Sequence, residues 1–228
     1  YNTAAGPLNI EILGHSSVIM HWNGQVIHID PYSEEADYSE QPKADLILVT
    51  HHHSDHFDPD AIAEIRKKDT VVISTEKVAH ALEDVTVLHN GERTTWNGIT
   101  IRATPAYNIV NMRAPGEPFH IPGEGNGYVM EIDPLRIYIA GDTELIPEMI
   151  ISANTFPSTI ELLLIGATSI LAMVPRSFSP ATISVPSPIA PAKSKIVTKY
   201  GSIMPSALPP AFCSSWITMS GLSEFTVN

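Results

Sequence analysis

The sequence predicts an α/β fold, of the α+β kind, in which two β-sheets carry helices on their outer faces. Two observations lead to this prediction. Short apolar runs rich in β-branched residues alternate with turn signals along most of the chain, which is typical of strands. Helical segments lie between and after these runs, which indicates sheets with helical outer layers. Because 43% of the 228 residues are hydrophobic, we expect one domain over residues 1–228 with a sizeable core.

The predicted elements begin with a meander of three strands, in which Asn23-Gly24 forms a hairpin turn. A fully apolar strand and a helix follow, with Asp58 as the helix cap and Pro59 in the first turn. Two later strands form a hairpin across residues 133–134. In order, the predicted strands are 9–13, 17–22, 26–30, 46–50, 71–74, 85–89, 99–103, 128–132, 135–140 and 161–165, and the predicted helices are 59–67 and 76–82.

Charge, hydropathy and cysteine count exclude several classes of protein. A net charge of −12 repels polyanions, so nucleic acid is not an expected partner. No apolar run approaches the roughly 18 residues that cross a bilayer, so we expect a soluble protein. The chain begins with Tyr1 rather than Met, which indicates N-terminal trimming and leaves cytoplasmic and periplasmic locations open. The single Cys213 excludes a disulfide framework and a Cys-rich zinc finger, so His and carboxylate groups would bind any metal.

Residues 162–228 differ in composition from the rest of the chain. Residues 1–161 hold 24 of the 25 acidic residues and all ten histidines, whereas 162–228 hold one acidic residue, Glu224, and 20 Ser and Pro residues. Because Ser and Pro interrupt helices and strands, one interpretation is a disordered tail. The segment also carries many apolar residues, which favours a second interpretation, a folded segment whose letters are doubtful.

The strongest chemical signal is the segment Thr-His-His-His-Ser-Asp-His at residues 50–56, placed between an apolar strand and a helix. The end of a strand is where ligands bind in layered α/β folds. His51 and His53 are two residues apart, so an extended backbone points both side chains the same way, and Asp55 and His56 follow as the chain turns. Imidazole and carboxylate groups suit zinc, with iron and manganese possible. The alternative is a surface histidine cluster.

These residues give the chain a specific resemblance to a known superfamily. It resembles the metallo-β-lactamase superfamily of metal-dependent hydrolases, whose signature is His-x-His-x-Asp-His, and within it the L-ascorbate-6-phosphate lactonase-like branch. The resemblance covers roughly residues 8–165 and implies a four-layer αββα sandwich with two divalent metal ions at one edge. The segments that carry it are Gly14-His15-Ser16-Ser17, Ile29-Asp30-Pro31, residues 50–56, Thr104-Pro105-Ala106-Tyr107-Asn108 and Ala140-Gly141-Asp142-Thr143.

The resemblance also implies roles for residues outside the His-rich segment. Asp142 corresponds to the carboxylate that bridges the two metals, against the alternative of a plain turn residue. Asp30 is expected to orient a ligand by hydrogen bonds or to cap a turn. His15 is expected to be either a pocket-wall histidine behind the ligands or a structural one.

Two positions depart from the superfamily pattern. Where a third histidine for the first metal is usual, the chain has Asn108, a poor zinc ligand. His120 is the candidate replacement, the alternatives being a substrate contact and an ordinary loop residue. Where a late histidine is usual, the chain has Lys199, which cannot act as a ligand when protonated. Either a ligand has been lost or residue 199 is misidentified.

The function implied is a hydrolase that uses a metal-bound hydroxide on a lactone, ester or phosphoester of a small molecule, with Asp55 orienting the nucleophile or moving its proton. Zinc is the expected metal, two ions per chain. The alternative is a non-catalytic metal-binding protein with an incomplete second site, consistent with Lys199. A nuclease would need a basic channel, which the charge disfavours. The sequence predicts neither the substrate nor the oligomeric state.

Overall fold

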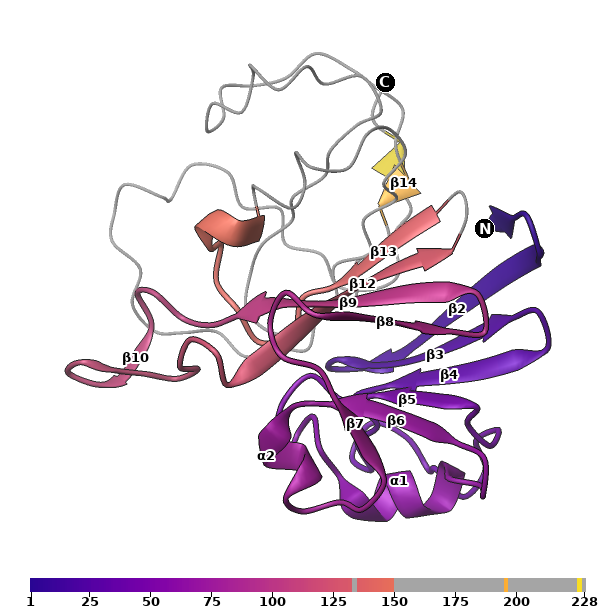
Figure 1. Cartoon of the computed structure of the whole chain (residues 1–228), viewed down its shortest axis with the longest axis horizontal. Coiled ribbons are helices and arrows are strands. Elements are labelled where there is room, and N and C mark those ends of the chain that lie inside the picture. The colour runs from indigo at the N-terminus through magenta and orange to yellow at the C-terminus, as the bar shows by residue number, and fades with distance from the viewer. Residues whose placement is uncertain (133–134, 150–194, 197–224, 227–228) are drawn as a thin grey trace. The chain divides into compact units, whose positions relative to one another are not determined.

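The computed structural model describes residues 1–132, 135–149, 195–196 and 225–226. The chain divides into two units, Tyr1–Pro180 and Ala181–Asn228. In the second unit, the described residues pair as two short antiparallel strands, β14 (Lys195–Ile196) and β15 (Phe225–Thr226). The first unit contains the two large sheets shown in Figure 1. The prediction of one domain over the whole chain stays a prediction.

The larger sheet has seven strands in sequence order, β1 to β7. Strands β2 to β4 form the predicted antiparallel meander, β1 adds to it as a further antiparallel strand, and β4 to β7 run parallel to one another. Asn23 and Gly24 join β3 to β4 with φ of 49° and 74°, as a two-residue hairpin requires. The strands are β1 (Asn2–Thr3), β2 (Gly6–Gly14), β3 (Ser17–Trp22), β4 (Gln25–Ile29), β5 (Leu46–Leu48), β6 (Val71–Ser74) and β7 (Val85–Val87).

The second sheet has four antiparallel strands in the order β13-β12-β9-β8. Between β9 and β12 the chain forms the small hairpin of β10 and β11 and then the loop that contains His120. The strands of the second sheet are β8 (Arg93–Trp96), β9 (Ile99–Ala106), β12 (Gly125–Ile132) and β13 (Leu135–Ile139), and those of the hairpin are β10 (Met112–Ala114) and β11 (Glu117–Pro118).

The two sheets pack face to face around a shared apolar core. Strand β5 and the residue after it show how the layers are arranged, because alternate side chains point to opposite faces. Leu46 and Leu48 join the core between the sheets, together with Met130 of the second sheet. Ile47 and Val49 point the other way, into a second cluster with helix α1 (Pro59–Ile65). A strand buried on both faces reads as a continuous apolar run, as the sequence does here.

Helices α1 and α2 (Glu76–Ala79) cover the outer face of the larger sheet (Figure 1). Asp58 caps α1 by accepting hydrogen bonds from the backbone N–H groups of Asp60 and Ala61, as predicted. The fold class is therefore confirmed as a layered α+β sandwich of two sheets. The helical layer expected on the outer face of the second sheet falls outside the described residues.

Several predicted boundaries were wrong by a few residues, for identifiable reasons. The strand predicted to reach Asp30 ends at Ile29, because Asp30 adopts a left-handed φ of 43°. The next strand ends at Leu48 rather than Thr50, whose N–H donates to the Asp30 carboxylate. Helix α1 ends at Ile65, followed by extended backbone.

Other elements were missed or could not be compared. Strand β8 was missed because its residues, Arg-Thr-Thr-Trp, are mostly polar, and β1 because it is only two residues long. Helix α2 is shorter than predicted, and β7 ends at Val87. The strand predicted at 161–165 and the position of Lys199 lie outside the described residues. Among the residues that are described, no helix is both long enough and apolar enough to cross a membrane.

A buried histidine in the larger sheet predicts how stability depends on pH. His28 on β4 has no exposed surface, and its Nε2–H donates to the carbonyl of Pro42 at 2.9 Å. Burial lowers the pKa of His28 from 6.5 to about 4. The unfolded chain therefore binds a proton that the folded chain excludes, so this contribution to stability is complete above pH 6.5 and is lost as pH falls to about 4.

Replacing His28 with Gln should remove this dependence. Between pH 6.5 and 4, wild type should lose about 3 kcal/mol more of its free energy of unfolding than His28→Gln. Urea unfolding at several pH values, with chelator present throughout, measures the difference. His89→Gln, at an exposed histidine, should follow wild type. If the free energy of unfolding fell equally with pH in wild type and in His28→Gln, the prediction would be contradicted.

Candidate metal centre

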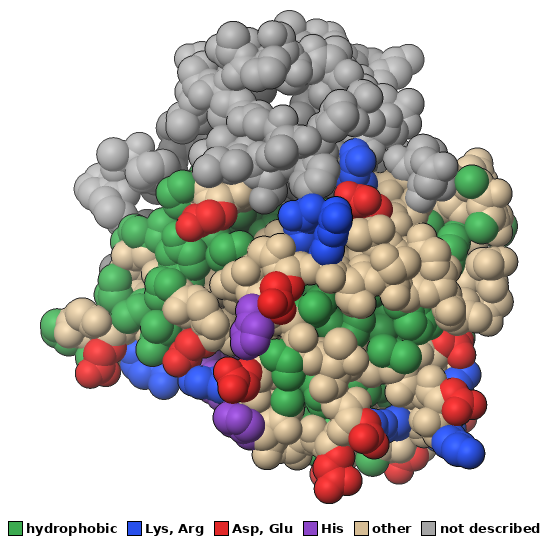
Figure 2. All heavy atoms as spheres, in the orientation of Figure 1, with side chains coloured by type: hydrophobic (Ala, Val, Ile, Leu, Met, Phe, Trp, Pro, Cys, Tyr) green, Lys and Arg blue, Asp and Glu red, His purple; other side chains and the backbone are tan. Residues whose placement is uncertain are grey.

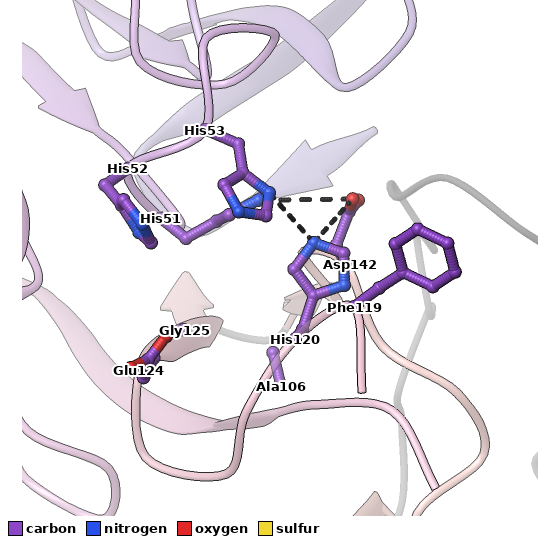
Figure 3. A pocket seen from close by; sticks show the side chains of 9 residues that line it. All are labelled: His51, His52, His53, Ala106, Phe119, His120, Glu124, Gly125 and Asp142. Carbon is purple, nitrogen blue, oxygen red and sulfur yellow. Dashed lines mark hydrogen bonds and ion pairs between the residues drawn. The ribbon is translucent and has the colours of Figure 1, made fainter. Parts of the chain in front are cut away.

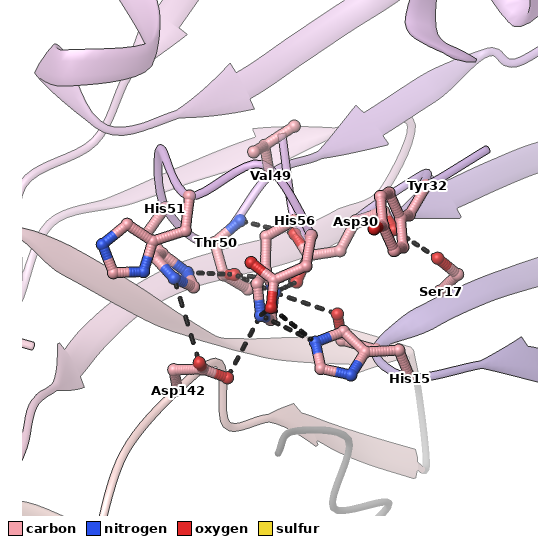
Figure 4. Close-up of polar contacts among 12 residues, drawn as sticks. His15, Ser17, Asp30, Tyr32, Val49, Thr50, His51, His56 and Asp142 are labelled. Atoms are coloured by element: carbon pink, nitrogen blue, oxygen red, sulfur yellow. Dashed lines mark hydrogen bonds and ion pairs between the residues drawn. The ribbon is translucent and has the colours of Figure 1, made fainter. Parts of the chain in front are cut away.

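Side chains from both sheets meet where several strands end. The segment 50–56 follows β5, Asp30 follows β4, and Asp142 follows β13. His120 precedes β12, and His15 lies in the turn between β2 and β3. Figures 3 and 4 show these side chains pointing toward one another from the separate elements. The sandwich therefore gathers residues that are more than 120 positions apart in the chain, from His15 to Asp142.

Three imidazoles form the first group of potential ligand atoms. His51, His53 and His120 each offer a ring nitrogen, and the three nitrogens lie within 4.8 Å of one another. His120 Nε2 is 3.1 Å from His53 Nδ1. The ring of His51 stands edge-on to that of His120, with 4.9 Å between centroids. The predicted convergence of His51 and His53 is observed, and His120 joins them from the other sheet.

A second group lies beside the first and consists of His15, Asp55 and His56, again with ligand atoms within 4.8 Å. His15 Nε2 is 3.2 Å from Asp55 Oδ2 and 3.3 Å from His56 Nε2. The side chain of His56 is fully buried, whereas 42% of the Asp55 side chain is exposed. Asp55 is therefore the most accessible carboxylate of the cluster.

Asp142 lies between the two groups (Figure 4). One carboxylate oxygen is 3.2 Å from His56 Nε2, and the other is 3.3 Å from His120 Nε2 and 4.0 Å from His51 Nε2. The preceding residue, Gly141, has a φ of 64°, and a Cβ at this position would come within 2.7 Å of the carbonyl oxygen of Asn126. Only glycine fits this turn, which fixes the direction of Asp142.

The donor set fits a metal ion. His51 Nε2 is buried and makes no hydrogen bond to any described residue, an arrangement that is costly unless another group satisfies it. Two ligand atoms bound to one tetrahedral zinc, each at about 2.0 to 2.1 Å, lie about 3.3 Å apart. Three distances between donor atoms are close to this value. His120 Nε2 is 3.1 Å from His53 Nδ1, and the Asp142 carboxylate is 3.3 Å from His120 Nε2 and 3.2 Å from His56 Nε2.

The protonation states of the first group also suit metal binding. Burial lowers the pKa of His51 from 6.5 to about 2. Burial also lowers the pKa of His53 and of His120. All three imidazoles are therefore neutral at physiological pH, and a neutral imidazole offers the lone pair that a metal needs. The first group can receive a cation without losing protons.

His56 is different because it lies between two carboxylates, the buried Asp30 and the partly buried Asp142. Burial alone would lower the pKa of His56, but the charges of Asp30 and Asp142 outweigh it and raise the pKa to about 10. Asp30 Oδ2 is 2.8 Å from His56 Nδ1. Asp30 also accepts hydrogen bonds from the N–H and hydroxyl of Thr50, both at 2.7 Å. Asp30 thus holds the ring of His56 from behind and connects it to the start of the His-rich segment, as predicted for an orienting residue.

Asn108 supports His120 rather than offering a ligand atom to the cluster. Its side-chain oxygen is 2.6 Å from His120 Nδ1 and 3.0 Å from the His120 backbone N–H. Its amide nitrogen donates to Glu144 at 3.2 Å, which fixes the orientation of the amide. Because the amide oxygen only accepts, the His120 proton is on Nδ1 and the Nε2 lone pair faces Asp142.

Sequence reasoning missed some residues that shape the centre. Glu144 accepts hydrogen bonds from the backbone N–H groups of residues 109–111 and so anchors the loop that begins with Asn108. Ser16 Oγ is 2.9 Å from His56 Nδ1. Phe119 lies beside His120 in the wall of a pocket. The only signal for Glu144 and Phe119 was closeness in sequence to a candidate, whereas Ser16 lies in one of the segments that carry the resemblance. The pocket (Figure 3) is lined by His51, His52, His53, Ala106, Phe119, His120, Glu124, Gly125 and Asp142.

Comparisons with known proteins agree with this fold. Residues 9–168 match the family described as "Beta-lactamase superfamily domain". A UPF0173 metal-dependent hydrolase from Methanosphaerula palustris is 30% identical over 181 residues, which cover 76% of this chain and 79% of that protein. These matches place the chain in the class of metal-dependent hydrolases. The chain belongs to the metallo-β-lactamase superfamily and, within it, to the UPF0173 metal-dependent hydrolase family.

Solved structures show the same fold. A candidate metal-dependent hydrolase from Parabacteroides distasonis is 42% identical, with a TM-score of 0.62 over 66% of this chain and 68% of that one. Igni18, a metallo hydrolase from Ignicoccus hospitalis, is 24% identical, with a TM-score of 0.52 over 66% and 67%, and shows the fold alone. The narrower resemblance to the L-ascorbate-6-phosphate lactonase-like branch stays a prediction.

The support that Asp30 gives to His56 can be tested by replacing Asp30 with Asn. The amide has one accepting oxygen where the carboxylate has two, so one of the buried donors around it loses its partner. We expect the affinity for metal to fall by about 10- to 100-fold, the usual cost of losing an orienting contact. Competition with a chromophoric chelator measures it. Asp69→Asn, at an exposed aspartate, is the control, and equal affinities in both variants would refute the role.

Proposed function

We propose that this chain is a two-metal hydrolase that cleaves a lactone, ester or phosphoester bond in a small molecule. The observation that carries the proposal is the placement of the Asp142 carboxylate between two groups of imidazole and carboxylate donors. A shared carboxylate suits a pair of cations about 3.5 to 4 Å apart, because its negative charge offsets their repulsion. The family name supports metal-dependent hydrolysis and leaves the substrate open.

We assign the ligands from the two groups of donors. His51, His53 and His120 would hold the first metal, Asp55 and His56 the second, and Asp142 both. Mixed imidazole and carboxylate donors favour zinc, with manganese and iron as the other candidates. When bound, the two ions would supply a nucleophilic hydroxide at neutral pH, by lowering the pKa of water from about 15.7 to about 7, and would polarise the oxygen of the bond attacked.

Asp55 is the residue to which we assign the proton transfer. Its side chain is the most exposed of the cluster, and its hydrogen bond with His15 lowers its pKa. It is therefore a carboxylate at neutral pH, able to accept a hydrogen bond from the nucleophile and orient it toward the substrate. Phe119 and Ala106 add apolar surface to the pocket wall.

Charge and pocket composition favour a small substrate over a polyanion. The net charge of the chain is −12. On the face shown in Figure 2, Lys and Arg side chains lie among Asp and Glu side chains rather than in one continuous patch. Lys77, near the pocket, is paired with Glu124 at 2.8 Å. Phosphate backbones bind through clustered free cations, which this face does not offer.

Replacing His53 with Ala tests the proposal directly. The variant loses one of three imidazoles of the first group, so we expect at least one zinc ion per chain and nearly all hydrolytic activity to be lost while the fold is retained. Metal content by mass spectrometry, hydrolysis of a panel of lactones, esters and phosphoesters, and circular dichroism provide the measurements.

The matched control is His89→Ala, which removes an exposed imidazole outside the cluster. It should keep the metal content and activity of wild type, and chelator should abolish both in wild type. Unchanged metal content in His53→Ala would contradict the ligand assignment. Two bound metals in wild type with no hydrolysis of any panel member would instead favour the non-catalytic metal-binding protein.

A further inference from the structure

We infer that His15 is a direct ligand of the second metal, an inference that rests on the proposed function. His15 lies 41 residues before His56 in sequence, in the turn between β2 and β3. Its Nε2 atom nevertheless reaches the two donors of the second group (Figure 4). The structure thus places a second imidazole at this metal position, from an element separate from the His-rich segment.

The distances around His15 match those between ligands of one metal ion. His15 Nε2 is 3.2 Å from Asp55 Oδ2 and 3.3 Å from His56 Nε2. His56 Nε2 is in turn 3.2 Å from the nearer oxygen of Asp142. Donors on a tetrahedral zinc lie about 3.3 Å apart. All three distances therefore match the separation of two ligand atoms on one tetrahedral zinc ion, and His15 takes part in two of them.

Two ring nitrogens that face each other at 3.3 Å need something between them or a shared proton. His56 Nδ1 already faces Asp30 and Ser16, so only its Nε2 points to His15. A cation that displaces the proton of His56 would accept a lone pair from each of the two imidazoles at once.

The backbone around His15 is arranged to direct this side chain inward. His15 has a φ of 44°, a left-handed conformation that is uncommon for residues other than glycine. Such conformations persist where the surrounding structure imposes them and are common at functional sites. Here the next two residues hold the turn in place. Ser17 donates to the carbonyl of Asp30 at 2.6 Å, and Ser16 contacts His56.

His15 also answers a question raised by the sequence. The superfamily pattern implies a late histidine for the second metal, and this chain has Lys199 at that place. Without a further donor, the described residues give this metal one imidazole, His56, and the carboxylates of Asp55 and Asp142. His15 supplies the second imidazole. The second metal would then have four donor residues, namely His15, Asp55, His56 and Asp142.

The test compares zinc binding by wild type, His15→Asn and His15→Ala. Asn tolerates the left-handed backbone at this position and is a poor zinc ligand, so His15→Asn removes the imidazole while preserving the turn. We expect both variants to keep the tighter zinc ion and to bind the second at least about 100-fold more weakly, beyond the usual cost of an indirect contact. His89→Ala is the matched control.

A count of the coordinated rings separates a ligand from an orienting residue. In the protein loaded with two Co²⁺ ions, each coordinated histidine gives a paramagnetically shifted ring N–H signal in the proton NMR spectrum. His15→Asn, loaded at saturating Co²⁺, should lack one signal that wild type and His89→Ala show. An unchanged number of signals would overturn the inference even if affinity fell, because His15 would then act from outside the coordination sphere.

Failure of this inference can be told apart from failure of the proposed function. Wild-type protein that binds fewer than two metals would overturn both. Wild type that binds two metals, with a His15→Asn variant that binds two with equal affinity, would overturn only the role of His15. Circular dichroism of the metal-free proteins confirms that wild type and variant share one fold. A variant that is folded and has lost only the second metal supports the assignment.

Discussion

The contact of Asp142 with His51, His56 and His120 is the interaction on which the rest of the site depends. These imidazoles come from both sheets, and the carboxylate lies at the point where the two groups meet. Asp30 and Asp55 contact His56 and His15, but Asp142 is the carboxylate that contacts imidazoles of both groups. In the proposed two-metal site, this one negative group would be shared by the two cations. The packing of the sheets therefore determines the chemistry of the centre.

The parts of the site that the sequence predicted are those encoded locally. The spacing of the segment after an apolar strand is enough to predict that His51 and His53 point the same way and that the segment, with Asp55 and His56, binds metal. The turn at Asn23-Gly24 and the cap at Asp58 were predicted for the same reason, because the backbone geometry of each depends on neighbouring residues alone. The resemblance to a known superfamily added Asp142, which local patterns could not connect to the cluster.

The parts that the sequence could not settle depend on contacts across the fold. Nothing local distinguishes His120 from a loop histidine, and its role becomes clear only where Asn108 and Glu144 fix the ring. The position of His15 between Asp55 and His56 requires the turn between β2 and β3 to meet the end of β5. The sequence does not predict the substrate, because substrate specificity depends on the loops that line a pocket rather than on the fold that carries them.

A crystal of the full chain soaked in zinc tests the central claim most directly. Anomalous diffraction at the zinc absorption edge locates each ion independently of the protein atoms. The account predicts two peaks about 3.5 to 4 Å apart, one on either side of the Asp142 carboxylate. The first should lie among His51, His53 and His120, and the second beside His56. A single peak away from Asp142, or none at these imidazoles, would contradict it.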